Sequence, residues 1–272
     1  MITPTPLSRY RKRSSNACLN ISSIQIQGSG KKTVVKGIRF TSSTLTDTNL
    51  KSIPETGIPD LQRAGKSRTP VWYFLIELNE KMNPFTKFQK WYESECITTD
   101  TLIPSACCLS TTGTDGYPNA RFVSLKELKD EQFIITGPMD SRKGNELRNK
   151  PRAALTFWWP ATGRQVRVQG DVRQIDIFEA DRYFSERSRE SQIVSWASKQ
   201  GKPLKNNDSL KEQFNHYSNL HANKQVPRPE NWGGWEILPI RIEFLEFDAN
   251  RYHNRVLYVK SIDGWHPQNL QP

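Results

Sequence analysis

Residues 106–128 read ACCLSTTGTDGYPNARFVSLKEL, and this stretch gives the clearest indication of the fold. Residues 106–112 and 120–128 are both strand-like runs, and Thr114-Asp115-Gly116 between them has the composition of a tight turn. Glycine reaches the positive φ angles that such turns require. The stretch therefore predicts a β-hairpin made of two antiparallel neighbours.

The segments after this hairpin extend the same pattern. Further strands are expected at residues 133–136, 153–159 and 165–175, and the last two are joined by a turn at residues 160–163. Because no helix alternates with these strands, a doubly wound parallel sheet is disfavoured. The predicted fold class is mainly β with helices, in the form of a closed or split antiparallel barrel with helices packed at its edge.

Helices are expected before, within and after these strands. Asn83-Pro84 is a favourable helix start, with an N-cap side chain followed by proline at the first helical position. Ser141 is a possible cap for a short helix. The expected helices begin near residue 83 and span 141–149, 177–186, 190–199 and 209–223, and the final strands are expected at 241–248, at 255–260 and in one short last segment.

The positive charge is concentrated in the N-terminal part of the chain. The net charge is +11, yet no acidic residue precedes Asp47, and eight basic residues do. The remainder holds 31 basic against 28 acidic residues, so a nucleic-acid-binding face is not expected. Residues 1–80 are interpreted as a basic, largely disordered extension, and residues 81–272 as the folded domain.

The same N-terminal composition bears on localisation. An acid-free segment rich in Arg and Ser is typical of organellar transit peptides, and a plain flexible tail is the alternative. The prediction is a cytoplasmic protein, with mitochondrial targeting as the alternative. No run of 18 apolar residues occurs, so no membrane span is expected. The four cysteines form no CxxC and no His pair has metal-ligand spacing, so no metal site is predicted.

Two cationic clusters are candidates for anion binding. Arg121-Phe-Val-Ser-Leu-Lys126 places two cations near the end of a strand, although a regular strand would direct them to opposite faces. Ser141-Arg142-Lys143-Gly144 opens a helix, where exposed N–H groups, a hydroxyl and two cations would together hold an anion. The alternatives are a solvated strand edge and ordinary helix capping.

Two further clusters lie toward the C-terminus. Tyr183, Arg187 and Ser191 are spaced by four residues, and a helix break near Ser188 would turn them into a cleft suited to phosphate, unless they form a mixed surface face. Trp232-Gly-Gly234 would allow close backbone approach to a flat ring. Arg251, His253 and Arg255 alternate along an expected extended segment, and the alternative is an exposed basic strand.

Six motifs in this order resemble the pyridoxine 5′-phosphate oxidase family, and the resemblance covers residues 83–272. The motifs are Ala120-Arg-Phe-Val-Ser-Leu-Lys126, Ser141-Arg-Lys-Gly144, Arg164-Gln-Val-Arg-Val-Gln-Gly170, Tyr183-Phe-Ser-Glu-Arg187 continuing through Ser191-Gln-Ile193, Trp232-Gly-Gly234, and Arg251-Tyr-His-Asn-Arg255. The resemblance implies a split β-barrel homodimer with FMN bound at the subunit interface.

The resemblance also implies roles for individual residues. The implied FMN contacts are Arg121, Phe122, Val123, Ser124, Ile135, Thr136, Arg142, Lys143, Gln165, Gln200, Gly201, Trp232 and Arg255. The implied substrate-binding residues are Lys126, Tyr183, Arg187, Ser191, Arg251 and His253, and the last two are also the implied catalytic residues beside the pyridine ring.

The implied reaction is oxidation of pyridoxine or pyridoxamine 5′-phosphate to pyridoxal 5′-phosphate. A hydride equivalent would pass from C4′ to flavin N5, and O2 would be reduced to H2O2. Neither nucleic acid nor a membrane is an expected partner. The family's usual basic segment before the first helix is not evident, and Gly201 and Asn254 replace usual residues. A catalytically weak or inactive paralogue that binds FMN or pyridoxal phosphate, and another type of split-barrel flavoprotein, are therefore the alternatives.

Overall fold

The computed structural model describes residues 23–26, 33–36, 83–98 and 103–272. The chain divides into two units, residues 1–80 and 81–272. In the first unit, β1 (Ser23–Ile26) and β2 (Thr33–Lys36) pair antiparallel. The rest of that unit, on which the expected disordered extension and targeting segment fall, lies outside the described residues.

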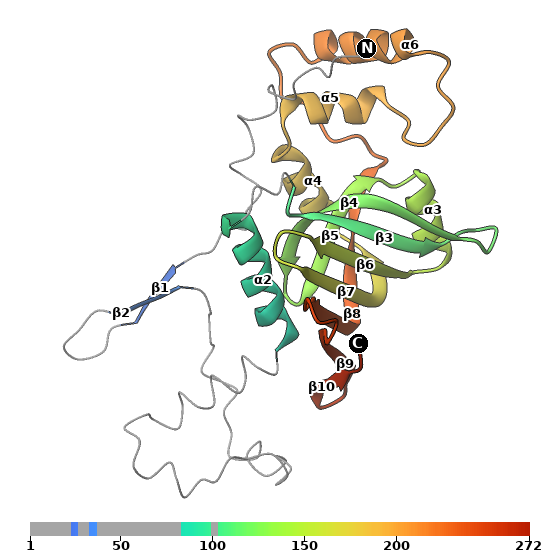
Figure 1. The fold of residues 1–272 in the computed structure, drawn as a ribbon. Coiled ribbons are helices and arrows are strands. Elements are labelled where there is room, and N and C mark those ends of the chain that lie inside the picture. Colours follow the sequence, from blue (N-terminus) through green and yellow to red (C-terminus); the bar gives the residue numbers. More distant parts are fainter. Residues whose placement is uncertain (1–22, 27–32, 37–82, 99–102) are drawn as a thin grey trace, which may run out of the picture. The chain divides into compact units, whose positions relative to one another are not determined.

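Six antiparallel strands of the second unit close into a barrel (Figure 1). They are β3 (Ala106–Thr112), β4 (Pro118–Lys129), β5 (Gln132–Pro138), β6 (Arg152–Trp159), β7 (Arg164–Gln174) and β8 (Trp232–Glu246). Their order is β8-β5-β4-β3-β6-β7, and pairing of β7 with β8 completes the ring. β9 (Asn254–Ser261) and β10 (Gly264–Leu270) extend the sheet from the second half of β8. The predicted barrel is thus confirmed.

The hairpin predicted from residues 106–128 is present. β3 pairs with β4 from Ala106 opposite Ser124 to Thr112 opposite Pro118. Gly116 in the connecting turn has a φ of 88°, so the left-handed conformation explains the glycine. Local turn chemistry and strand periodicity were sufficient here because the two strands are neighbours in sequence.

One helix packs against the aromatic core of the barrel. α2 (Pro84–Thr98) begins as predicted, with the Asn83 side chain accepting hydrogen bonds from the backbone N–H groups of Phe85 and Thr86 at 2.8 and 3.2 Å. Phe88 is completely buried, and its ring lies 4.9 Å from that of Phe133 and 5.0 Å from that of Phe157. Edge-on aromatic contacts of this kind anchor the helix.

The other helices in the described part of the chain are α3 (Arg142–Asn149), α4 (Ile177–Ser185), α5 (Arg189–Ala197) and α6 (Asn207–Leu220). The predicted break between α4 and α5 is present, and Ser188 caps α5. A second apolar cluster includes Tyr183 and Ile193 from these helices, together with Ile134 and Trp232 from the barrel strands. Within the described ranges, every helix is too short or too polar to span a lipid bilayer.

Two expectations near the C-terminus were wrong in detail. β8 begins at Trp232 rather than near residue 241, because the Gly-Gly pair is part of the strand and pairs with β5. A Cβ on Gly234 would meet the Ile135 carbonyl oxygen at 2.6 Å, so a glycine at this position allows β8 to pass close to β5. Arg251 has a φ of 66° in the turn before β9, so residues 251–255 do not form one extended segment.

Candidate functional site

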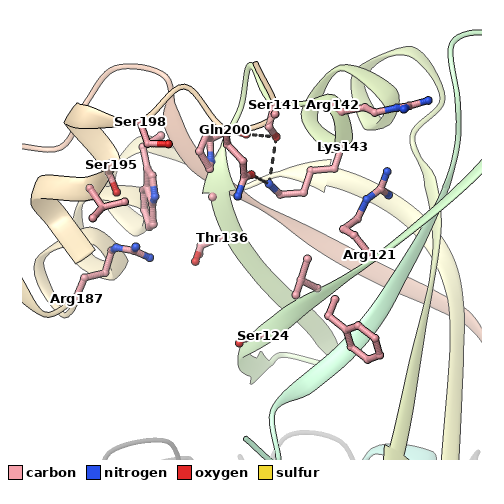
Figure 2. A pocket seen from close by; sticks show the side chains of 17 residues that line it. Arg121, Ser124, Thr136, Ser141, Arg142, Lys143, Arg187, Ser195, Ser198 and Gln200 are labelled. Carbon is pink, nitrogen blue, oxygen red and sulfur yellow. Dashed lines mark hydrogen bonds between the residues drawn. The ribbon is translucent and has the colours of Figure 1, made fainter. Parts of the chain in front are cut away.

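A cavity of about 570 Å³ lies between β4, β5, the start of α3 and the segment around α5 (Figure 2). This volume is within the range of cofactor and ligand sites. The structure brings many of the predicted site residues together in its wall: Arg121, Phe122, Val123, Ser124, Thr136, Arg142, Lys143, Arg187, Gln200, Gly201 and Trp232. Val194, Ser195 and Ser198 also line it and were not predicted.

Lys143 is a buried cation in this wall. It is the second residue of α3, and its Nζ donates hydrogen bonds to Ser141 Oγ at 3.1 Å and to Gln200 Oε1. Burial, and secondarily the charge of Arg121, lowers the pKa of Lys143 to about 8, although Asp140 opposes the shift. Because a buried charge without a counter-charge is costly, this position favours a bound anion.

Glu146 fixes the two arginines beside Lys143. Its carboxylate is 2% exposed and accepts hydrogen bonds from Arg121 Nη2 at 2.7 Å and Arg142 Nε at 3.0 Å. Thr111 Oγ1 and Asn119 Nδ2 donate to it at 2.6 and 2.7 Å. Burial alone would raise the pKa of Glu146, but these hydrogen bonds from Thr111 and the arginines lower it below its usual value, so the group is ionised.

Arg187 lies on the opposite side of the cavity, on the helical side (Figure 2). Its guanidinium is 5.2 Å from the Trp232 ring centroid, and Nη2 donates to the Ser191 carbonyl at 3.3 Å. Its Nε is buried and has no hydrogen-bond partner among the residues that the structure describes. Burial lowers the pKa of Arg187. An unpartnered buried donor is expected to receive an acceptor from a ligand.

Lys126 lies beside the C-terminal end of α4 rather than in the cavity wall. The β4–β5 register passes from Leu125 opposite Ile135 to Glu127 opposite Ile134, so Lys126 is the extra residue of a β-bulge. This bulge breaks the regular alternation assumed from the sequence. Lys126 Nζ lies 2.7 Å from Glu186 Oε2.

The other two members of the predicted phosphate set are also engaged within the chain. Tyr183 is buried, and its hydroxyl donates to Glu127 Oε2 at 2.7 Å. Burial, followed by this hydrogen bond, raises the pKa of Tyr183, so its hydroxyl stays protonated. Ser191 Oγ accepts a hydrogen bond from Ser188 Oγ at 3.0 Å.

A second group of predicted residues does not line the cavity. Leu245 of β8 is opposite Gln165 on one side and Arg255 on the other, so those two flank the same strand position. Arg255 donates to Glu243 at 2.7 Å, and His253 Nδ1 accepts from the Asp248 backbone N–H at 3.1 Å. Arg251 is exposed in the adjoining turn, and Ile135 is buried within β5.

Sequence reasoning missed the carboxylates that hold the cations. Glu146 follows Arg142 by four residues, and Glu186 follows Arg182 by four, which is the spacing of helical ion pairs. That spacing was the available signal, but the contacts with Arg121 and Lys126 depend on the tertiary fold. Among the described residues, no group of three or more His, Cys, Asp or Glu side chains is placed to hold a metal ion.

Comparisons with known proteins give a consistent result. A family model described as pyridoxamine 5′-phosphate oxidase matches residues 101–221, and one described as the pyridoxine 5′-phosphate oxidase C-terminal dimerisation region matches residues 232–272. The chain is 38% identical over 198 residues to a pyridoxine/pyridoxamine 5′-phosphate oxidase of Colwellia psychrerythraea, covering 73% of this chain and 91% of that one. It is 38% identical over 217 residues to the protein of that name from Thermosynechococcus vestitus, covering 80% and 100%.

Solved structures of similar fold agree with these family matches. PhzG from Burkholderia lata, in complex with tetrahydrophenazine-1-carboxylic acid, superposes with a TM-score of 0.66 at 26% identity, covering 70% of this chain and 93% of that one. A pyridoxamine 5′-phosphate oxidase-related, FMN-binding protein from Nostoc punctiforme gives a TM-score of 0.51 at 18% identity, covering 62% and 88%. The second likeness concerns the fold alone.

Proposed function

The chain belongs to the pyridoxine/pyridoxamine 5′-phosphate oxidase family, and on that premise we propose that it oxidises pyridoxine or pyridoxamine 5′-phosphate to pyridoxal 5′-phosphate with FMN, reducing O2 to H2O2. The observation that carries the proposal is a single cavity with cations on two sides. Lys143 and Arg121 lie on one side, and Arg187 lies on the other. Two anion sites suit a phosphorylated cofactor together with a phosphorylated substrate.

The cavity residues fit FMN. The hydrogen bonds of the buried Lys143 go to two neutral acceptors, Ser141 Oγ and Gln200 Oε1, and Glu146 holds Arg121 in place at the same end. A phosphate here would restore the charge balance that burial of Lys143 disturbs. When bound, FMN supplies the two-electron redox chemistry, and the protein binds, orients and shields the reactants.

The substrate phosphate is assigned to the opposite side. Arg187 offers an unpartnered Nε and a forked guanidinium held over Trp232, and such a fork suits phosphate oxygens. Lys126, Tyr183 and Ser191 lie on the adjoining bulge and helices. Fixing the phosphate orients the pyridine ring toward the flavin, which makes the reaction effectively intramolecular.

A homodimer supplies the remaining groups. The matched C-terminal dimerisation region covers Trp232, Arg251, His253 and Arg255. Because Gln165, Arg251, His253 and Arg255 do not line the cavity of their own chain, we assign them to the cavity of a second copy. There, Arg251 and His253 would flank the substrate ring and exclude water.

A second candidate function is oxidation of a reduced phenazine-type carboxylic acid. The structural likeness to PhzG favours it. The cationic residues around Arg187 favour the phosphorylated substrate instead. A third candidate, a non-catalytic FMN-binding protein, is motivated by the unusual Gly201 and Asn254.

Anaerobic reduction of the bound flavin separates these candidates. FMN-loaded protein is mixed in turn with pyridoxine 5′-phosphate, pyridoxine and tetrahydrophenazine-1-carboxylic acid, and loss of the visible flavin absorbance is followed. The proposal predicts rapid bleaching by pyridoxine 5′-phosphate and slow or no bleaching by the other two. Bleaching by the phenazine acid alone supports the second candidate, and no bleaching by any compound supports the third.

A further inference from the structure

Two carboxylates of the chain form ion pairs with the cations next to the assigned substrate-phosphate position. Glu186 Oε2 lies 2.7 Å from Lys126 Nζ, and Glu186 Oε1 lies 3.2 Å from Arg182 Nη1. Glu127 Oε2 accepts hydrogen bonds from Arg182 Nη2 at 3.1 Å and from the Tyr183 hydroxyl at 2.7 Å. Two of the predicted phosphate ligands, Lys126 and Tyr183, therefore have internal acceptors.

From this network we infer that Glu186 determines the affinity for the substrate phosphate by competing with it for Lys126. Binding of a phosphorylated ligand exchanges the Glu186 carboxylate for a phosphate oxygen at the Lys126 ammonium. The inference rests on the proposed function, in that it takes the substrate phosphate to bind on the Arg187 side of the cavity.

The geometry allows this exchange. Glu186 directly follows the last residue of α4, and its side chain is 43% exposed, whereas that of Lys126 is 29% exposed. An ion pair between partly exposed groups is weak and easily broken. When Lys126 leaves, the Glu186 carboxylate stays paired with Arg182, so no charge is stranded. Lys126 also has a flexible four-carbon stem that allows it to reorient.

The position of Glu186 makes it relevant to the cavity. The next residue, Arg187, lines the cavity and has the unpartnered Nε, and Ser124, two residues before Lys126, lines it as well. A phosphate held by Arg187 therefore lies where it can compete with the Glu186 carboxylate for the Lys126 ammonium. The competing interpretation is that Glu186 only fastens the bulge to α4.

Substitution of Glu186 distinguishes these interpretations. FMN-loaded wild type and Glu186→Gln protein are titrated with pyridoxal 5′-phosphate and, separately, with unphosphorylated pyridoxal. The matched control is Glu179→Gln, which removes the same charge from α4 itself; Glu179 pairs with Lys129 and Arg182, not with Lys126. Glu186→Asp, which shortens the side chain, serves as a second variant should the first fold poorly, and thermal melting checks all of them.

The expected result is selective tightening. Glu186→Gln lowers the Kd for pyridoxal 5′-phosphate roughly two- to fivefold, as the strength of partly exposed ion pairs allows. The Kd for pyridoxal is unchanged, Glu179→Gln resembles wild type, and Glu186→Asp shifts in the same direction as Glu186→Gln. In a Lys126→Met background, the gain from Glu186→Gln disappears, because the competition requires the ammonium group.

Three results would overturn the inference: an unchanged or higher Kd for pyridoxal 5′-phosphate in Glu186→Gln, an equal gain for pyridoxal, or a gain that persists in the Lys126→Met background. Absence of pyridoxal 5′-phosphate binding in every variant overturns it as well. Turnover is measured separately. The predicted binding pattern without turnover refutes the proposed function alone, and turnover with unchanged binding refutes the inference alone.

Discussion

Raising the pH is expected to weaken FMN binding through a single side chain, Lys143. Burial lowers the pKa of Lys143 to about 8 in the ligand-free protein. A bound phosphate dianion favours the charged form and raises that pKa again. At about pH 7 most of the Lys143 side chains carry the proton with or without FMN, so the affinity changes little with pH there. Above about pH 8, the free protein loses the proton that binding needs.

The magnitude follows from the fraction of protonated Lys143. With a pKa of about 8, that fraction falls about tenfold between about pH 7 and about pH 9, so the Kd for FMN should rise about tenfold, or roughly 1.4 kcal/mol. The second ionisation of a phosphate monoester, near pH 6, is already complete over this range. The ligand therefore contributes little to the change.

Quenching of flavin fluorescence measures the Kd at each pH. Riboflavin, which lacks the phosphate, is the control ligand, and Lys143→Arg, which keeps its charge, is the control variant. Both should give flat profiles between about pH 7 and about pH 9. A flat profile for FMN with the wild type, or an equal slope with Lys143→Arg, would refute the assignment of the phosphate to Lys143.

Four further predictions follow from the same contacts. Lys143→Met should raise the melting temperature of the FMN-free protein by a few degrees near neutral pH. The pKa of Lys143 is lower in the folded than in the unfolded protein, so its charge lowers the free energy of unfolding, and this cost disappears only as the pH rises from about 8 toward 10.5. An unchanged or lower melting temperature argues against this. Glu146→Ala should lower the free energy of unfolding in urea by about 3–5 kcal/mol, because it leaves Arg121 and its neighbours without their shared acceptor. Asp171→Ala, which removes one member of an exposed ion pair with Arg152, should lower it by less than about 0.5 kcal/mol. Arg251→Ala should lower kcat while FMN remains bound, and an unchanged kcat contradicts its assignment to the substrate ring. Arg187→Ala should mainly raise KM, because an anchor acts in both ground and transition states; a lower kcat with unchanged KM counts against it.

Much of the fold was predictable because its signals are local. The helix start at Asn83 and the hairpin around Gly116 depend on residues only a few positions apart, and both are present. The start of β8 was missed because glycines weaken the strand pattern, and only pairing with β5 makes Trp232 and its neighbours a strand.

The residues of the candidate site were likewise predictable only where their signals are local. Arg121 and Lys143 were identified from charge beside a strand end and a helix start, and the fold brings them into one cavity. The placement of Lys126 on a bulge was not predictable, because the bulge exists only in the register between β4 and β5. The role of Glu146 was also hidden, since its donors come from β3, β4 and α3.

The most direct test of the proposed activity is multiple turnover in air. Purified full-length protein is loaded with FMN and supplied with pyridoxine 5′-phosphate, and the pyridoxal 5′-phosphate formed is counted per bound flavin together with H2O2. We expect many equivalents of both products in equal amounts. FMN binding with no more than one equivalent of pyridoxal 5′-phosphate would contradict the proposed activity.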